Sequence, residues 1–300
     1  MDSEIIVLDG GMGKHLERSG APFRQPEWSA LALLEDPDAV RLAHLDFIEA
    51  GADVIIVNSY AIVPFHIGED RFVERANELA SLAGRLAREA ADAAERPVRV
   101  AASLPPLFGS YEPDKFRPAD APWRYDILVE AQAPFVDLWL AETVSSIAEA
   151  EAIMAAVDRH DPAAELWMAY TVPDEMPGTE VTLRSGESIE AAVAAVSSRA
   201  AAILFNCSPP EAITVALGQA QVALGANPGG IRIGGYANAF LPKVDGYAAN
   251  EGLLGRREEL TPDAYHDICA KWIADGATII GGCCQIFPEH IHALDDLRGV

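Results

Sequence analysis

Three cysteines follow two short apolar runs of the chain in matching positions. Cys207 comes directly after the run 202–206, and Cys283 and Cys284 follow the run 277–280 and two glycines. Apolar runs of this length are typical of buried strands, so we expect the three sulfurs where two strands end. Three thiolates form a soft site that suits zinc, and a catalytic zinc keeps its fourth position open for a substrate. The pattern therefore predicts one zinc ion held by these cysteines.

The residues alone leave two other interpretations of the cysteines open. A lone cysteine after a strand is most often a small buried hydrophobe, and Cys269 fits that packing role on the apolar face of an expected helix. The adjacent Cys283 and Cys284 could instead form a redox couple, which would leave Cys207 without a role. Four cysteines in 300 residues are too few for a secreted disulfide framework. We therefore favour metal ligation in a reducing compartment, the cytoplasm.

Two carboxylates occupy similar positions at other expected strand ends. Asp9 ends the first apolar run and precedes Gly10 and Gly11, and Glu142 ends the fourth run. Because a buried charge needs a partner, one hypothesis is an ion pair with Lys14 or an arginine, or a hydrogen bond from loop amides. The functional hypothesis is that both carboxylates hold a substrate ammonium, while backbone N–H groups of the two glycines hold a carboxylate. Together with a zinc ion that binds sulfur, these groups would bind an amino acid with a thiol side chain.

The expected reaction follows from the metal and the thiol. Zinc deprotonates a thiol that coordinates it, so a sulfur nucleophile exists near neutral pH without a general base. Such a sulfur would attack an activated alkyl group. A sulfonium is a suitable donor, since aromatic faces can stabilise its positive charge.

The elements that must position these residues alternate strictly along the chain. Each of eight apolar runs precedes a helical pattern, and the runs are nearly continuous, as expected for strands buried on both faces. The pattern predicts an α/β fold, a single (βα)8 TIM-type barrel over residues 1–300, with an open doubly wound sheet as the alternative. Expected strands lie at 5–8, 54–58, 98–103, 138–141, 166–170, 202–207, 231–236 and 277–283, and the longest expected helix lies at 70–95.

Barrel closure explains how distant residues could share one site. The carboxyl ends of all eight strands meet at one mouth of such a barrel, where active sites lie. Two irregular segments, 105–122 and 172–186, should lie at the same face, and we expect them to shape a donor pocket.

Composition excludes several classes of partner. The net charge of −24 argues against nucleic acid, because phosphates would be repelled. No apolar run reaches the ~18 residues that a membrane helix needs. The acidic start, Met1 to Glu4, does not resemble a signal peptide. We expect small-molecule substrates, no nucleic acid and no membrane; the pattern does not determine an oligomeric state.

The sequence resembles the homocysteine S-methyltransferases over almost its whole length. The resemblance implies zinc on the three cysteines, with homocysteine sulfur as a further ligand. It also implies that Asp9 and Glu142 hold the amino group of homocysteine, and that amides near Gly10 and Gly11 hold its carboxylate. The motifs that carry it are Leu8-Asp9-Gly10-Gly11-Met12-Gly13, Ala50-Gly51-Ala52-Asp53 with Asn58-Ser59-Tyr60, Glu142-Thr143, Asn206-Cys207 with Pro210-Glu211, and Gly281-Gly282-Cys283-Cys284 with Pro288.

The same resemblance implies roles for three further residues and for the donor. Asn238 matches an asparagine that can approach the zinc when substrate is absent. Trp28 and Tyr60 match aromatic positions near the methyl-transfer site, with loop packing as the alternative. Thr143 stands where the betaine-using branch carries a tyrosine, so the chain looks closer to the branch that uses S-methylmethionine or S-adenosylmethionine.

The implied function is methyl transfer from such a sulfonium to homocysteine, forming methionine. Two alternatives remain within the enzyme class: betaine or another methylated donor, and a selenol acceptor. A third alternative is a non-catalytic protein that binds zinc or thiols.

Overall fold

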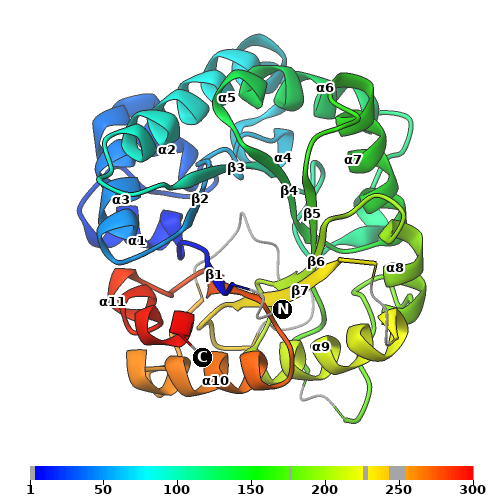
Figure 1. Ribbon diagram of the computed structural model, residues 1–300. Helices are drawn as coiled ribbons and strands as arrows, with labels where there is room; N and C mark the ends of the chain where they lie inside the picture. The colour runs from blue at the N-terminus through cyan, green and yellow to red at the C-terminus, as the bar shows by residue number, and fades with distance from the viewer. Residues whose placement is uncertain (1–3, 176–177, 226–228, 243–253, 300) are drawn as a thin grey trace.

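Eight parallel strands form one sheet at the centre of the molecule, surrounded by helices (Figure 1). The computed structural model describes residues 4–175, 178–225, 229–242 and 254–299. Strand neighbours follow chain order, and the last strand pairs with the first. The strands are β1 (Ile6–Val7), β2 (Val54–Ile56), β3 (Arg99–Leu104), β4 (Leu138–Val144), β5 (Leu166–Tyr170), β6 (Ala202–Asn206), β7 (Arg232–Ala237) and β8 (Ile279–Gly282).

The sheet closes between its first two strands. Leu8, just after β1, forms a parallel bridge with Val54 of β2. The Asp53 N–H also donates to the Val7 carbonyl at 2.7 Å. These contacts confirm the (βα)8 barrel, and the alternative of an open doubly wound sheet is wrong.

The helices surround this barrel in chain order. Each of the eight helices expected from the sequence is present, and α5 stops at Asp92 rather than at residue 95. The α-helices are α1 (Met12–Arg18), α2 (Ala30–Glu35), α3 (Pro37–Glu49), α4 (Pro64–Ile67), α5 (Glu69–Asp92), α6 (Ala121–Gln132), α7 (Ile147–His160), α8 (Ile189–Val196), α9 (Pro210–Leu224), α10 (Pro262–Ala274) and α11 (Pro288–His292). Three 3₁₀ turns lie at Pro113–Lys115, Ala133–Phe135 and Asp295–Gly299. Among the described residues, no helix combines the length and apolar character that a membrane crossing demands.

Local signals explain where these helices begin. Asp36 precedes α3, and its side chain accepts from the Ala39 N–H at 3.3 Å. Ser146 caps α7 in the same way, by accepting from the Glu149 N–H at 3.2 Å. Capping satisfies an N–H that the first helical turn leaves without a partner.

In the described part of the chain, side chains fill the barrel interior below its mouth. Alternate residues of each strand point inward, as Leu138 and Leu140 do on β4 and Ala202 and Leu204 on β6. The strands pack so closely that Gly234 of β7 has no room for a Cβ, which would lie 1.9 Å from the Ile279 carbonyl oxygen.

Candidate metal centre and substrate pocket

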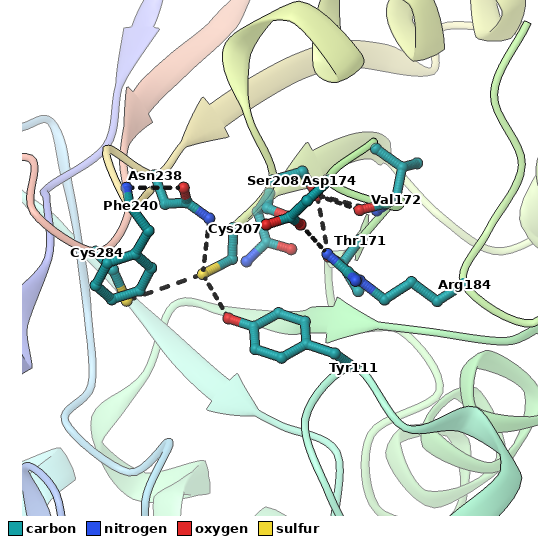
Figure 2. Close-up of polar contacts among 11 residues, drawn as sticks. Tyr111, Thr171, Val172, Asp174, Arg184, Cys207, Ser208, Asn238, Phe240 and Cys284 are labelled. Carbon is teal, nitrogen blue, oxygen red and sulfur yellow. Dashed lines mark hydrogen bonds and ion pairs between the residues drawn. The ribbon is translucent and has the colours of Figure 1, made fainter. Parts of the chain in front are cut away.

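The three cysteine sulfurs come together at the mouth of the barrel. Cys207 follows β6, Cys283 and Cys284 follow β8, and their Sγ atoms all lie within 4.8 Å of one another. The Sγ atoms of Cys207 and Cys284 are 3.8 Å apart (Figure 2). Within the described ranges, this is the one cluster of histidine, cysteine and carboxylate groups that could hold a metal.

The cluster fits a zinc ion in both distance and chemistry. Tetrahedral zinc with bonds of about 2.3 Å places its sulfur ligands about 3.8 Å apart. Hydrogen bonds with Cys207 and Cys284, together with burial, raise the pKa of the Cys283 thiol well above its usual value. Three crowded sulfurs therefore ionise together only if a cation lies among them. Because Cys207 belongs to the cluster, a redox couple of Cys283 and Cys284 alone does not describe it.

A pocket extends from the sulfurs into the mouth of the barrel. The sequence-predicted residues Asp9, Gly10, Gly11, Trp28, Tyr60, Glu142, Cys207, Cys283 and Cys284 all line it. Asn238 lies beside it, with Nδ2 3.9 Å from the Cys207 Sγ and Oδ1 accepting from the Phe240 N–H at 3.1 Å (Figure 2). The structure thus brings together every residue that the sequence proposed for the site.

The backbone is strained at this pocket. In the described part of the chain, every non-glycine residue with positive φ lines the pocket or directly follows Cys284. Such conformations cost of order 1–3 kcal/mol each and persist only where the surroundings enforce them. The residues are Trp28 (52°), Tyr111 (71°), Thr143 (60°), Cys207 (48°) and Gln285 (67°).

Asp9 is a buried carboxylate with one oxygen unused. Its Oδ2 accepts from the Ile56 N–H at 2.8 Å, and its Oδ1 has no hydrogen-bond partner. Burial raises the pKa of Asp9 well above its usual value. The expected alternative, an ion pair with Lys14, is wrong, because the Lys14 Nζ lies 2.6 Å from Glu17 Oε2. A cationic group of a ligand would donate the hydrogen bond that Oδ1 lacks.

Glu142 is the second buried carboxylate of the pocket. It accepts a hydrogen bond from the Ser103 hydroxyl. Burial raises its pKa to about 7, and the neighbouring Cys207 adds to the rise. β4 continues to Val144, so Glu142 lies within the strand rather than after it, next to an irregularity between Ala141 and Val144. Such irregularities redirect side chains at the rims of barrels.

Gly10 and Gly11 allow two loops to approach each other closely. A Cβ on Gly10 would lie 2.4 Å from the Ile286 carbonyl oxygen, and one on Gly11 would lie 2.6 Å from that of Cys283. The Gly11 N–H donates to Ile286 O at 2.8 Å. Of the two glycine amides, that of Gly10 is therefore the one left for a ligand carboxylate.

Aromatic rings form much of the remaining wall. The Trp28 ring lies 5.0 Å from that of Phe23 and 6.4 Å from that of His66. The Tyr60 hydroxyl lies 2.6 Å from the Ser110 hydroxyl. His66 donates from Nδ1 to the Pro26 carbonyl at 2.6 Å, and burial lowers its pKa to about 4, so its ring is neutral. Among the described residues that line the pocket, none is a lysine or arginine.

Sequence reasoning gave no individual role to several lining residues, among them His66, Tyr111 and Phe240. Tyr236 was expected at the end of strand 231–236 without a role in the site. In the structure it lies one residue before the end of β7, and its buried hydroxyl has no hydrogen-bond partner. Tyr111 carried no signal, because it belongs to an irregular loop.

Asn206, at the end of β6, is hydrogen-bonded to Thr143 of β4. Its Oδ1 accepts from the Thr143 N–H at 2.8 Å, and its Nδ2 donates to the Thr143 hydroxyl at 3.0 Å. The residue before Cys207 thus fixes the backbone that carries Glu142.

Comparison with known proteins now identifies the family. A family model described as Homocysteine S-methyltransferase matches residues 6–297 of the chain. The chain belongs to the homocysteine S-methyltransferase family. It is an enzyme that acts on homocysteine and a methyl donor, and its three-cysteine cluster is a zinc site.

Individual homocysteine S-methyltransferases and related enzymes align along most of the chain. Homocysteine S-methyltransferase 1 from Brassica oleracea var. italica is 28% identical over 97% of this chain and 93% of the relative. Selenocysteine methyltransferase from Astragalus bisulcatus is 28% identical over 96% of this chain and 90% of the relative. The solved structure of the homocysteine methyltransferase MmuM from Escherichia coli, metallated form, matches with a TM-score of 0.77 and 26% identity over 99% and 97% of the two chains.

Proposed function

We propose that Cys207, Cys283 and Cys284 are the zinc ligands and that homocysteine binds with its sulfur at the remaining position. Asp9 and Glu142 would hold its ammonium group, and the Gly10 N–H its carboxylate. One observation carries this assignment: the sulfur cluster and two carboxylates without ion-pair partners among the described residues line one pocket. These groups suit the thiol and the ammonium of a small thiol amino acid.

Each group of the chain has a distinct task in this reaction. Bound zinc supplies the charge that keeps the substrate thiol ionised near neutral pH. Asp9 and Glu142 orient the amino acid, so that its sulfur faces the aromatic wall. Trp28 and Tyr60 would then position the donor methyl in line with that sulfur, and such positioning supplies much of the rate.

We propose a sulfonium donor, S-methylmethionine or S-adenosylmethionine. Aromatic rings and carboxylates around the pocket, with no lysine or arginine in its described lining, favour a cationic donor. Thr143 carries no aromatic hydroxyl, and Asn206 already bonds its side chain. Betaine and other methylated donors are the alternatives.

A selenol acceptor is a second candidate. The similarity to a selenocysteine methyltransferase supports it, since selenols and thiols share the chemistry of metal binding and methyl transfer. Competition between homocysteine and selenohomocysteine would separate the two acceptors.

We further propose that residues 1–300 act as one domain in the cytoplasm. The single closed sheet supports one domain, and the clustered thiols suit a reducing compartment. The net charge of −24 supports small-molecule substrates rather than nucleic acid.

The first test is methionine formation by the reduced, zinc-loaded protein. Homocysteine would be offered with S-methylmethionine, S-adenosylmethionine or betaine in parallel reactions, and we expect turnover with a sulfonium. Tight homocysteine binding without methionine from any donor would favour the non-catalytic alternative.

The ligand assignment has a separate test with a matched control. We expect Cys207→Ala to lose bound zinc and activity while its far-UV circular dichroism is unchanged. Cys269→Ala should keep both, because Cys269 is buried against α10 neighbours outside the cluster. Full zinc content in Cys207→Ala would overturn the assignment.

A further inference from the structure

The two irregular segments meet beside Cys207, where one residue of each makes contact with the other. The Tyr111 hydroxyl, from segment 105–122, lies 3.0 Å from the Cys207 Sγ. The Arg184 guanidinium, from segment 172–186, lies over the Tyr111 ring, 4.6 Å from its centroid. These two segments therefore reach the sulfur cluster through a stacked pair of side chains.

An ion pair and a hydrogen bond hold the Arg184 side chain in place. Its Nη2 lies 2.5 Å from Asp174 Oδ1, and the two side chains are only 12% and 6% exposed. Its Nε donates to the Thr171 hydroxyl at 3.2 Å. A buried ion pair gives little net stability, but removing one partner is costly, so it fixes geometry more than it strengthens the fold.

The hydrogen bonds around Arg184 also extend to Ser208, beside the metal centre. Thr171 Oγ1 lies 3.0 Å from the Ser208 hydroxyl, which accepts from the Val172 N–H at 3.0 Å (Figure 2). Ser208 directly follows Cys207. Arg184 is thus connected to the backbone of Cys207 on one side and, through Tyr111, to its sulfur on the other.

The backbone of Tyr111 shows that its position is enforced. Its φ of 71° is unfavourable for a residue with a bulky side chain. The cost is offset only if contacts such as the ring stacking and the contact with sulfur hold the residue there.

We propose that Tyr111 is a positioning residue of the zinc centre and that Arg184 clamps it in place. A thiolate ligand has no proton, so the phenol donates its hydrogen bond to the Cys207 sulfur. This bond fixes the sulfur on one side of the metal, while the ring forms part of the wall along which the donor approaches. The inference rests on the proposed zinc ligation by Cys207, and it extends the centre to two residues that do not touch the metal.

The test compares Tyr111→Phe, which keeps the ring and loses the hydroxyl, with wild type. Outer hydrogen bonds to metal ligands typically affect metal affinity about 10–100-fold. We expect zinc affinity, measured by chelator competition, to fall about 10-fold. In cobalt-substituted protein, the sulfur-to-metal charge-transfer band should shift to lower energy, because a thiolate without a hydrogen bond donates more strongly.

The clamp is tested by Arg184→Gln and Arg184→Lys. Both remove the planar guanidinium from the ring, so both should shift the cobalt band in the same direction as Tyr111→Phe, by a smaller amount. The matched controls are Arg199→Gln, which breaks a 2.6 Å pair with Asp158, and Tyr170→Phe, which loses a hydrogen bond to Ala192 O. Both controls should keep the wild-type spectrum.

The outcomes are separable from those of the methyl-transfer assay. A shifted spectrum in Tyr111→Phe supports the inference even if none of the donors is used. Wild-type zinc affinity and an unshifted band in Tyr111→Phe would overturn it, and an unshifted band in both Arg184 variants would overturn the clamp. A wild-type protein without any cobalt–sulfur band would refute the ligand assignment and this inference together.

Discussion

The buried carboxylates are the residues whose charge depends most on what the pocket holds. Asp9 and Glu142 both have raised pKa values, mainly because burial disfavours their charged forms. A substrate ammonium between them would offset that cost and favour ionisation. The proposed binding mode therefore links substrate binding to the ionisation of these two groups.

Glu142→Gln tests this link through pH. The pKa of Glu142 is about 7, so below pH 7 the carboxyl is protonated and binds an ammonium poorly. In wild type, the inhibition constant for methionine, which has the ammonium but no ionisable thiol, should rise as pH falls through 7. In Glu142→Gln it should be about 10-fold higher above pH 7, as for loss of a charged hydrogen bond, and should change less with pH. Equal pH profiles for both proteins would contradict the assignment.

Glu149 offers a test of burial away from the metal. It lies in the first turn of α7 and accepts from the Ser145 N–H at 2.8 Å, and burial raises its pKa to about 7. Between the usual carboxyl pKa and 7, the folded state binds more protons than the unfolded state, so the free energy of unfolding falls as pH rises.

In Glu149→Gln this contribution should vanish. The stability difference between wild type and variant should change by up to about 3 kcal/mol between pH 4.5 and pH 8, measured by urea unfolding at each pH. The exposed Glu151 on the same helix provides the control variant, Glu151→Gln. If the stability difference between wild type and Glu149→Gln stayed constant from pH 4.5 to pH 8, Glu149 would be ionised in the folded protein throughout this pH range.

At the scale of elements, the sequence predicted the alternation of strands and helices because burial leaves recognisable apolar patterns. The eight strands are nearly continuous apolar runs, and helices such as α3, α5 and α9 repeat apolar residues every three or four positions. The short α1, α2 and α4 were missed, since helices of one or two turns show no periodicity. The chain order of the strands then placed Cys207 and Cys283 at one mouth.

The irregular segments could not be predicted in the same way. Their conformation depends on contacts between residues far apart in sequence, such as Tyr111 with Arg184 and Arg184 with Asp174. Single residues in unusual backbone conformations also leave no pattern. The sequence therefore indicated the groups that we propose for homocysteine binding better than those that we propose for the donor side.

Strand packing gives a prediction at this scale. The registered pair Gly234 and Ile279 joins β7 to β8, and a Cβ on Gly234 would overlap the Ile279 carbonyl. Gly234→Ala should destabilise the protein by about 3 kcal/mol or more, since neither strand can move without breaking the ladder. Gly218→Ala, on the exposed face of α9 with open space around it, should stabilise by up to about 1 kcal/mol. Chemical denaturation measures the free energy of unfolding of both variants. Equal values for the two variants would contradict the prediction.

At the scale of the whole molecule, the zinc site depends on the barrel more than the barrel depends on zinc. The sheet is closed by backbone pairing between β1, β2 and β8 without help from the cysteine side chains. The metal should therefore add only the stability that mass action provides.

Zinc removal by a chelator should abolish activity and leave the far-UV circular dichroism spectrum intact. At free zinc 100 times its dissociation constant, the metal should contribute about 2.7 kcal/mol to the free energy of unfolding. Thermal unfolding with and without chelator measures this shift. Loss of secondary structure at room temperature would show instead that the metal is required for folding.

The position of β8 also determines when the enzyme can first become active during its synthesis. This last strand pairs with β1, and two of the three cysteines of the cluster directly follow it. A nascent chain on the ribosome carries Cys207 and both carboxylates long before it can capture zinc. Metal capture and barrel closure therefore coincide, and an incomplete chain neither sequesters zinc nor consumes homocysteine.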